Sequence, residues 1–496
     1  MIKTLIHFSF LFSIFCAVPF TLVAQKNKQK EPQHKLVFNI KDCKDDMMFL
    51  TLQFKDKFLL KDSANNSGNG VFIFEGGEKY DEGMYSLISG DSKARLLDFI
   101  MDGSQMFTFY LDTALNIYDF SVVGSPENSE LLRFQQKSFT AKKQIIELSE
   151  KRKEFEEKEL KDSAEYYLKK MKEIDAEMEQ FITELIDANP NFLFSKMQKS
   201  FREIEIPEAP ANADGSIDSS FRAVYYRTHY WENFDLTDRR FLFLPSYDPK
   251  LTNYFKKILW FQERDTITKY MDLMLDKTRP DSLMFRYLIE FLSREFETSK
   301  IIDHDAIFVH LVNNNQLAGK CIWMDEDLIK KYKQRIEDIE PMLIGKKSVE
   351  MIIPDTSQTK WYSSYNLPKK YRILWFYDHK CSHCQKDSKE LKAVYDSLAS
   401  IGELNFDVYA VNQTEDIAGW KKYIRENNYS WINVGGTTGN VDWKKEYHIL
   451  QNPQFYIINQ DKNIILNKNI PKDMIPKFLE DHEKIEAEKA RLKKNK

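Results

Sequence analysis

An apolar run followed by two closely spaced cysteines and a helical pattern constrains the fold of this chain most. Residues 371–377 are almost entirely apolar, and a C-S-H-C sequence from Cys381 to Cys384 precedes a helix-like stretch at 385–398. Two cysteines in the first turn of a helix can close a small disulfide ring. The unpaired N–H groups of a helix N-terminus favour the thiolate form of the first cysteine. The segment therefore predicts a strand, a redox-active dithiol and a helix in succession.

Two other interpretations of the cysteine pair are weaker. A zinc site needs about four ligands, whereas Cys16, Cys43 and Cys321 are isolated in the sequence and only His379 and His383 lie near the pair. A structural disulfide closing so short a loop would constrain the unfolded chain little and add little stability. We therefore expect neither a metal nor an organic cofactor.

The sequence around the dithiol predicts a small α/β domain. Pro453 lies at the start of an apolar strand, a position that suits a cis X-Pro turn leading into the strand. The segments expected after the dithiol helix are a strand at 406–412, a helix at 418–427, strands at 449–458 and 464–466, and a helix at 473–484. Together with the first strand and helix, the expected order is β-α-β-α-β-β-α.

This pattern resembles the thioredoxin fold, specifically the TlpA/ResA-like thiol–disulfide oxidoreductases, over residues 346–480. The resemblance implies that Cys381 attacks a disulfide and that Cys384 resolves the mixed disulfide. It also implies that a cis Pro453 faces the dithiol and that its neighbour Asn452 helps to bind the backbone of the substrate.

Asp387 has the position of an acidic residue that assists proton transfer in the ResA-like members, although an exposed acid that merely stabilises the helix N-terminus is an equal alternative. The chain departs from thioredoxin at Trp375, which replaces a buried aspartate, and at Lys380 and Lys389, which replace a tryptophan and a proline. We expect His383, between the cysteines, to contact the substrate and stabilise the thiolate, unless it points into water. A stabilised thiolate implies a potential less reducing than that of thioredoxin.

The first 24 residues have the features of a secretory signal. Lys3 precedes an apolar run at 5–20 that is short for a permanent membrane helix, although an uncleaved anchor remains an alternative. We expect a periplasmic or cell-envelope protein with a linker at 25–34, and no later segment is apolar enough to span a membrane. The net charge of −4, with both signs mixed, gives no indication of nucleic-acid binding.

The region before the thioredoxin-like segment predicts two further domains. Short apolar runs separated by turn residues indicate a β-sandwich or barrel at 35–124 without a catalytic cluster, and 125–345 is mostly helical. An apolar stripe from Leu160 to Leu185 indicates an amphipathic helix within 128–188, which we expect to pack on its own chain rather than form a dimeric coiled coil. Residues 481–496 read as a charged tail.

The expected architecture is therefore multidomain, with an N-terminal all-β domain, a central mostly α-helical domain and a C-terminal α/β thioredoxin fold. This order resembles a modular group of exported Bacteroidota proteins, and residues 123–128 and 226–239 carry that resemblance. An aromatic cluster at 225–231 could form a binding platform, but packing in a helical core is favoured.

The resemblance implies an exported enzyme that exchanges disulfides with envelope proteins bearing cysteine pairs or disulfides. A second thiol protein would supply or accept the electrons. The alternative is a cell-envelope binding or assembly protein that uses its thioredoxin-like domain for docking. The direction of the redox reaction, the state of Cys43 and Cys321 and the oligomeric state stay open at this point.

Overall fold

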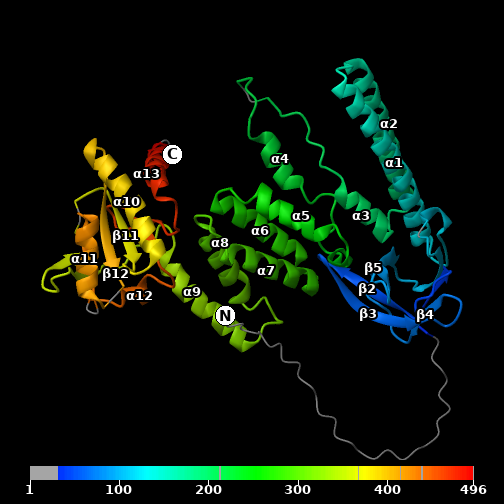
Figure 1. Ribbon diagram of the computed structural model, residues 1–496, viewed down its shortest axis with the longest axis horizontal. Helices are drawn as coiled ribbons and strands as arrows, with labels where there is room; N and C mark the ends of the chain where they lie inside the picture. Colours follow the sequence, from blue (N-terminus) through cyan, green and yellow to red (C-terminus); the bar gives the residue numbers. More distant parts are fainter. Residues whose placement is uncertain are drawn as a thin grey trace, which may run out of the picture. The chain divides into compact units, whose positions relative to one another are not determined.

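The computed structural model describes residues 32–494 except Leu115, 212–213, Leu367, Thr414 and 437–438. The predicted secretory signal and residues 25–31 of the predicted linker lie outside the described residues. The chain divides into two compact units, Met1–Ser195 and Lys196–Lys496 (Figure 1). Within the described ranges, no helix is both long and apolar enough to cross a bilayer.

The first unit contains a β-sandwich, as the sequence predicts. Its two four-stranded sheets have the strand orders β4-β1-β7-β8 and β3-β2-β5-β6. Phe38 of one sheet packs on Phe99 of the other, with 5.4 Å between ring centroids, so the inner faces form a common core. The strands are β1 His34–Lys41, β2 Met47–Phe54, β3 Lys57–Asn65, β4 Val71–Gly76, β5 Gly83–Ser89, β6 Arg95–Met101, β7 Met106–Asp112 and β8 Ser121–Val123.

The residues of the junction after β8 each have an identifiable structural role. Gly124 has a φ of +91°, and a Cβ there would lie 2.6 Å from the carbonyl oxygen of Met106. Ser125 caps helix α1 (Pro126–Glu157) by accepting a hydrogen bond from the Asn128 N–H. The buried amide of Asn128 accepts from the N–H of Ile100 and donates to its carbonyl oxygen, both at 2.8 Å. Residues 123–128, which carry part of the resemblance seen in the sequence, thus join the sandwich to the helix.

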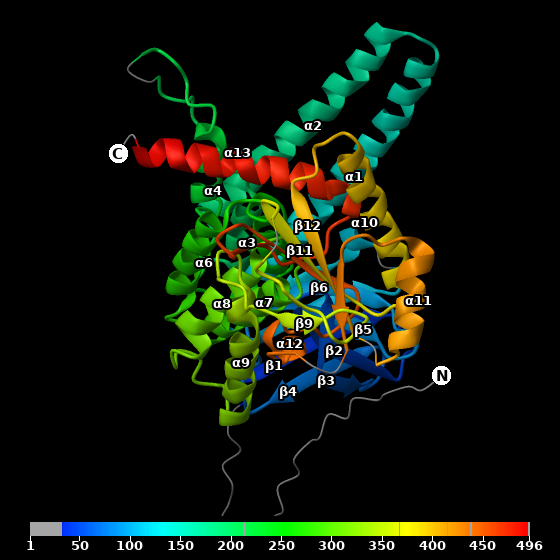
Figure 2. The same cartoon turned by 90° about the vertical axis from the view of Figure 1, so that its left-hand side faces the viewer.

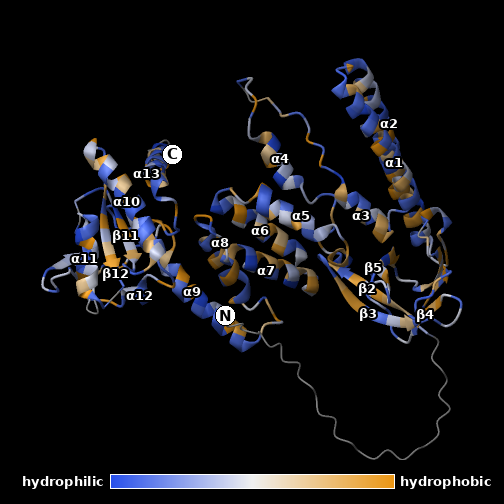
Figure 3. Ribbon diagram, viewed as in Figure 1, coloured by the Kyte–Doolittle hydropathy of each residue, from blue (hydrophilic) through white to orange (hydrophobic). Residues whose placement is uncertain are grey.

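Helix α1 and helix α2 (Lys161–Ala188) form a hairpin rather than one continuous helix. The chain reverses at Glu159, which has a φ of +59°. Phe155 of α1 stacks on Tyr167 of α2 at 5.5 Å, so the predicted apolar stripe packs on its own chain. Figure 3 shows that hydrophilic residues predominate along the hairpin, in contrast to strands such as β11.

Helices dominate the first part of the second unit. The predicted aromatic cluster enters the core at its C-terminal end, because Tyr230 and Trp231 are buried and Tyr230 stacks on Tyr254 at 4.9 Å. The helices longer than five residues are α3 Leu193–Phe201 (which begins at the end of the first unit), α4 Phe221–His229, α5 Tyr247–Asn253, α6 Arg264–Thr278, α7 Ser282–Glu297, α8 His304–Leu311 and α9 Glu326–Ile339.

The C-terminal part of this unit is built on a five-stranded sheet with the order β13-β12-β11-β14-β15. Strand β11 is fully buried and pairs in parallel with β12 and antiparallel with β14. The strands are β11 Tyr371–Tyr377, β12 Phe406–Asn412, β13 Ile432–Gly435, β14 Gln454–Ile458 and β15 Ile464–Leu466. A separate two-stranded sheet pairs β9 Ile352–Pro354 with β10 Trp361–Ser363.

Helices cover the central sheet according to the alternation of its side chains. Tyr371, Ile373 and Trp375 share a core with α10 (Ser382–Ser400), α11 (Ile417–Asn427) and α13 (Ile475–Lys494). Leu374 and Phe376 share the opposite core with β9 and α12 (Trp443–Glu446). Figure 2 shows α10 and α11 on one side of the sheet and α12 on the other. The predicted fold class is confirmed for all three parts of the chain, and residues 481–494 of the predicted charged tail belong to α13.

Candidate active site: a dithiol at the start of helix α10

The cysteine pair lies where the central strand β11 leads into helix α10. Cys381 is the N-cap residue of α10; its N–H donates to the Asp378 carbonyl oxygen at 3.1 Å, and its own carbonyl accepts from the Gln385 N–H at 3.0 Å. Cys384 follows in the first turn. Both thiols are free, and they differ in exposure, since Cys381 is partly exposed and Cys384 is fully buried. One sulfur can therefore meet a partner molecule while the other is held beneath it.

The buried thiol is kept in its neutral form. The pKa of Cys384 is raised to about 12, mainly by burial and also by the hydrogen bond to Cys381 and the charge of Cys381, although a backbone hydrogen bond at Asp378 opposes the shift. At neutral pH Cys384 is thus a thiol that can donate a hydrogen bond to the sulfur of Cys381. It can act as a nucleophile only after losing its proton.

Pro453 precedes β14 at the end of the sheet where β11 leads into the dithiol loop. The Asn452–Pro453 peptide bond is cis, which confirms that element of the sequence prediction. The pairing of Phe376 with Gln454 places the start of β14 beside the end of β11. Asn469 holds this loop, because its side chain donates to the Pro453 carbonyl oxygen at 2.8 Å and accepts from the Phe455 N–H at 3.2 Å.

Asp387, the predicted proton acceptor, forms an ion pair. Its Oδ2 lies 3.1 Å from the Nζ of Lys472, whose side chain is only 3% exposed. This ammonium group also lies 5.1 Å from the ring of Trp375 and 4.5 Å from that of Phe455. The buried ammonium group of Lys472 therefore lies beside Trp375, the residue that replaces the buried aspartate of thioredoxin. Sequence reasoning missed Lys472, because its partner lies far away in the chain.

A second polar cluster beside the dithiol centres on His379, which the sequence suggested only as a metal ligand. This buried imidazole lies 3.8 Å from carboxylate oxygens of both Asp378 and Asp416. Lys380 pairs with Asp416 at 2.9 Å, and its hydrogen bond is the main reason why the pKa of Asp416 is lowered. The cluster joins the dithiol loop to the start of α11.

The remaining predicted residues lie near the same loop. His383 is exposed, so its side chain is in contact with solvent and a partner molecule can reach it. The side-chain oxygen of Asn452 is buried and has no hydrogen-bond partner among the described residues. Across those residues no group of three or more histidine, cysteine or acidic side chains is arranged to hold a metal ion. Cys43 and Cys321 are free thiols.

Known proteins match two parts of the chain. Residues 369–464 match the family described as thioredoxin-like, and residues 160–340 match a domain of unknown function, DUF5106. The central five-stranded sheet and the dithiol at the start of α10 agree with the first match. The C-terminal domain therefore belongs to the thioredoxin-like family, a class that includes thiol–disulfide oxidoreductases. No curated protein matches the chain.

Several solved structures from Bacteroidota are similar to the chain. A thioredoxin-like protein from Bacteroides caccae is 20% identical and covers 56% of this chain and 99% of its own, with a TM-score of 0.43. A domain of a "possible thiol-disulfide isomerase" from Cytophaga hutchinsonii is 31% identical and covers 29% of this chain and 95% of its own, with a TM-score of 0.26. The thioredoxin domain of a thiol-disulfide oxidoreductase from Bacteroides vulgatus is 20% identical and covers 27% of this chain and 96% of its own, with a TM-score of 0.24.

Proposed function

We propose that this protein is an exported thiol–disulfide oxidoreductase that exchanges disulfides with partner proteins of the cell envelope. The observation that carries the proposal is the pairing of a partly exposed thiol, Cys381, with a fully buried one, Cys384, in the first turn of α10. Membership of the thioredoxin-like family supports the class of reaction. The secretory signal expected from the sequence supports the location.

The reaction proceeds by two exchanges at sulfur. The Cys381 thiolate attacks one sulfur of the partner's disulfide, and the other sulfur leaves as a thiolate that takes up a proton. Cys384 loses its proton and attacks the Cys381 sulfur of the mixed disulfide, which releases the second partner thiol. Two electrons have then passed to the partner, and a Cys381–Cys384 disulfide remains. The same steps in reverse oxidise a dithiol partner.

Two neighbouring features serve these steps. The Asn469 side chain fixes the loop that carries Asn452 and Pro453, which we assign to the binding of the partner's backbone. Asp387, on the same helix as Cys384, is the candidate for accepting the proton that Cys384 must lose. A separate thiol protein restores the starting redox state, and no metal or organic cofactor takes part.

A trapping experiment tests the proposal. In the reduced full-length Cys384→Ser variant the second exchange is blocked. Incubation with insulin, a protein with accessible disulfides, is therefore expected to give a mixed-disulfide adduct that dithiothreitol cleaves. The Cys381→Ser variant is the matched control and should give none. Adducts in neither variant, together with no reduction of insulin by the wild type, would contradict the proposal and favour a docking domain without turnover.

A further inference from the structure

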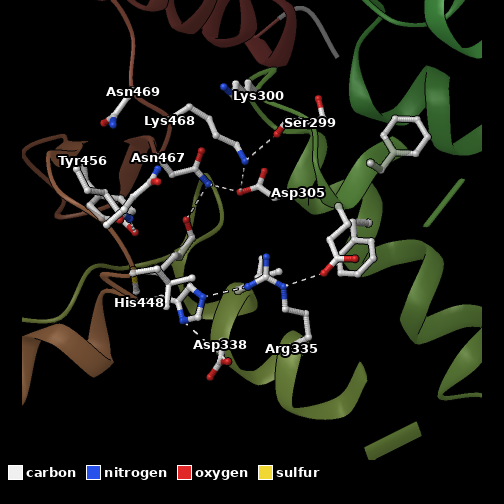
Figure 4. A pocket seen from close by; sticks show the side chains of 18 residues that line it. Ser299, Lys300, Asp305, Arg335, Asp338, His448, Tyr456, Asn467, Lys468 and Asn469 are labelled. Carbon is white, nitrogen blue, oxygen red and sulfur yellow. Dashed lines mark hydrogen bonds and ion pairs between the residues drawn. The ribbon is translucent and has the colours of Figure 1, made fainter. Parts of the chain in front are cut away.

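A cavity of about 560 Å³ lies between the helical part of the second unit and the thioredoxin-like domain (Figure 4). The end of α7, the following loop and helices α8 and α9 form one wall, and segments 448–456 and 467–469 of the thioredoxin-like domain form the other. The cavity is thus a feature of the two parts together, and the thioredoxin-like domain alone would lack half of it.

This cavity adjoins the cis-proline loop. Gln451 and Gln454, which flank Asn452 and Pro453, both line it. So does Asn469, whose side chain holds the loop through the Pro453 carbonyl oxygen and the Phe455 N–H. A polypeptide bound at this loop would therefore have the cavity next to it.

Polar contacts hold the two walls together. Arg335 of α9 donates to Nε2 of His448 at 3.0 Å and also pairs with Glu297 at 3.2 Å (Figure 4). Burial lowers the pKa of His448, which leaves its imidazole neutral and able to accept this bond. Lys468 donates to the Ser299 carbonyl oxygen at 3.4 Å. The cavity is accordingly formed before any partner arrives.

The segment that carries Asn469 also contacts the helical wall. The Asn467 side chain donates to Asp305 and, at 3.0 Å, to the carbonyl oxygen of Met342. Its own Oδ1 atom is buried and accepts no hydrogen bond from the described residues. An N–H donor entering the cavity would satisfy this oxygen.

Most of the side chains that line the cavity are polar, and their formal charges balance. The acidic side chains Glu297, Asp305 and Asp338 are balanced by Lys300, Arg335 and Lys468. Glu297 pairs with Arg335, and Asp305 pairs with Lys468. Asp338 lies beside the neutral His448, and exposed Lys300 has no ion-pair partner in the part of the chain that the structure describes. Small-molecule sites are lined mainly by apolar groups. The side-chain amides of the lining suit a polypeptide backbone, and the unpaired ammonium group of Lys300 suits a negative side chain on that polypeptide.

We propose that this cavity binds an extended segment of the disulfide partner, next to its reacting cysteine, and that Lys300 selects an acidic side chain in that segment. The inference rests on the proposed disulfide exchange and adds the class of substrate. The helical domain thereby contributes to substrate choice at a redox site that lies wholly in the thioredoxin-like domain.

Rates of disulfide reduction by the reduced full-length protein test the proposal. The probes are hydroxyethyl disulfide, which is small and uncharged, and two synthetic disulfide peptides that differ only in carrying glutamate or lysine in the segments beside the cysteines. An exposed ion pair contributes little, so we expect the glutamate peptide to react about threefold to fivefold faster than the lysine peptide. The preference should weaken at high salt.

Two charge-reversal variants locate the effect. Lys300→Glu should abolish or invert the preference between the peptides. Lys330→Glu reverses an exposed lysine of α9 that does not line the cavity, so it should keep the wild-type preference. Equal rates for the two peptides in the wild type, or an unchanged preference in Lys300→Glu, would overturn the inference while reduction of hydroxyethyl disulfide upholds the proposed function. No reaction with any probe would overturn both.

Discussion

Cys381 and Cys384 are three positions apart in the sequence, but their surroundings differ. The first stands at a helix N-terminus with access to solvent, and the second is enclosed by the core between β11 and α10. The C-x-x-C spacing predicts the first property, because the helix start can be read from the sequence. The depth of Cys384 depends on Trp375, Trp420 and other core residues that come together only in the fold.

The pKa of Cys384 leads to a prediction about alkylation. Since burial raises this pKa to about 12, the reactive thiolate of Cys384 is a minor species at every pH from 6 to 9. Its alkylation by iodoacetamide in the reduced protein should rise about tenfold per pH unit over that range without a plateau. Peptide mass spectrometry separates Cys384 from Cys381. A plateau below pH 9 would contradict the assignment of a buried, neutral thiol.

The burial of Lys472 and its ion pair with Asp387 could not be predicted from the sequence. Its pairing with Asp387 joins the first turns of α10 to a short 3₁₀ turn near the C-terminus. A lysine after a proline in a loop gives no sign that it will be buried. Asp387 could be predicted as a candidate from its spacing to Cys384, whereas its partner Lys472 could be recognised only in the folded structure.

At the scale of elements, pattern and register explain most of the thioredoxin-like domain. Strands β11, β12 and β14 were predicted because they are apolar runs bounded by polar turns, and α10 because residues 385–398 have a helix-like pattern. Strand β13 was missed, since it has four residues and ends in glycine. Strand β3 was missed for another reason: its apolar residues Phe58, Leu59 and Leu60 are exposed at a sheet edge and do not alternate with buried positions.

The loop before β14 is fixed by one side chain, so its rigidity can be tested there. Asn469→Ala removes both hydrogen bonds to the loop, at a cost of about 1 kcal/mol for each bond. The Phe455 amide should then exchange with solvent roughly fivefold faster, measured by NMR or mass spectrometry, and insulin should be reduced more slowly. Asn469→Asp keeps the acceptor for the Phe455 N–H and should retain most of the protection. Equal exchange in the two variants would show that the loop is held by other contacts.

At the scale of the whole molecule, the chain divides at Ser195, so α1 and α2 belong with the β-sandwich. The sequence grouped these helices with the later ones because both regions are helical. What ties the hairpin to the sandwich is local chemistry that composition does not reveal, above all the buried amide of Asn128 on Ile100. Glu127 adds a contact to α3 by accepting from the Phe194 N–H at 2.7 Å.

Replacing Asn128 tests this junction. Asn128→Leu leaves the buried N–H and carbonyl oxygen of Ile100 unsatisfied, which we expect to cost about 2–4 kcal/mol. Exchange of the Ile100 amide should accelerate by roughly thirtyfold or more, and proteases should cleave the first unit more readily. Gln144→Leu likewise replaces a side-chain amide by leucine, but at an exposed position of α1, and should alter neither. Unchanged protection of Ile100 in Asn128→Leu would contradict the role of this amide.

The central claim is that Cys381 and Cys384 form a working dithiol, and a redox titration of the full-length protein tests it most directly. The protein is equilibrated in glutathione buffers of increasing potential, and alkylated peptides are counted by mass spectrometry. The account predicts one two-electron transition in which Cys381 and Cys384 lose their thiols together, while Cys43 and Cys321 stay free. No reversible transition, or one that joins Cys381 to a different cysteine, would contradict it.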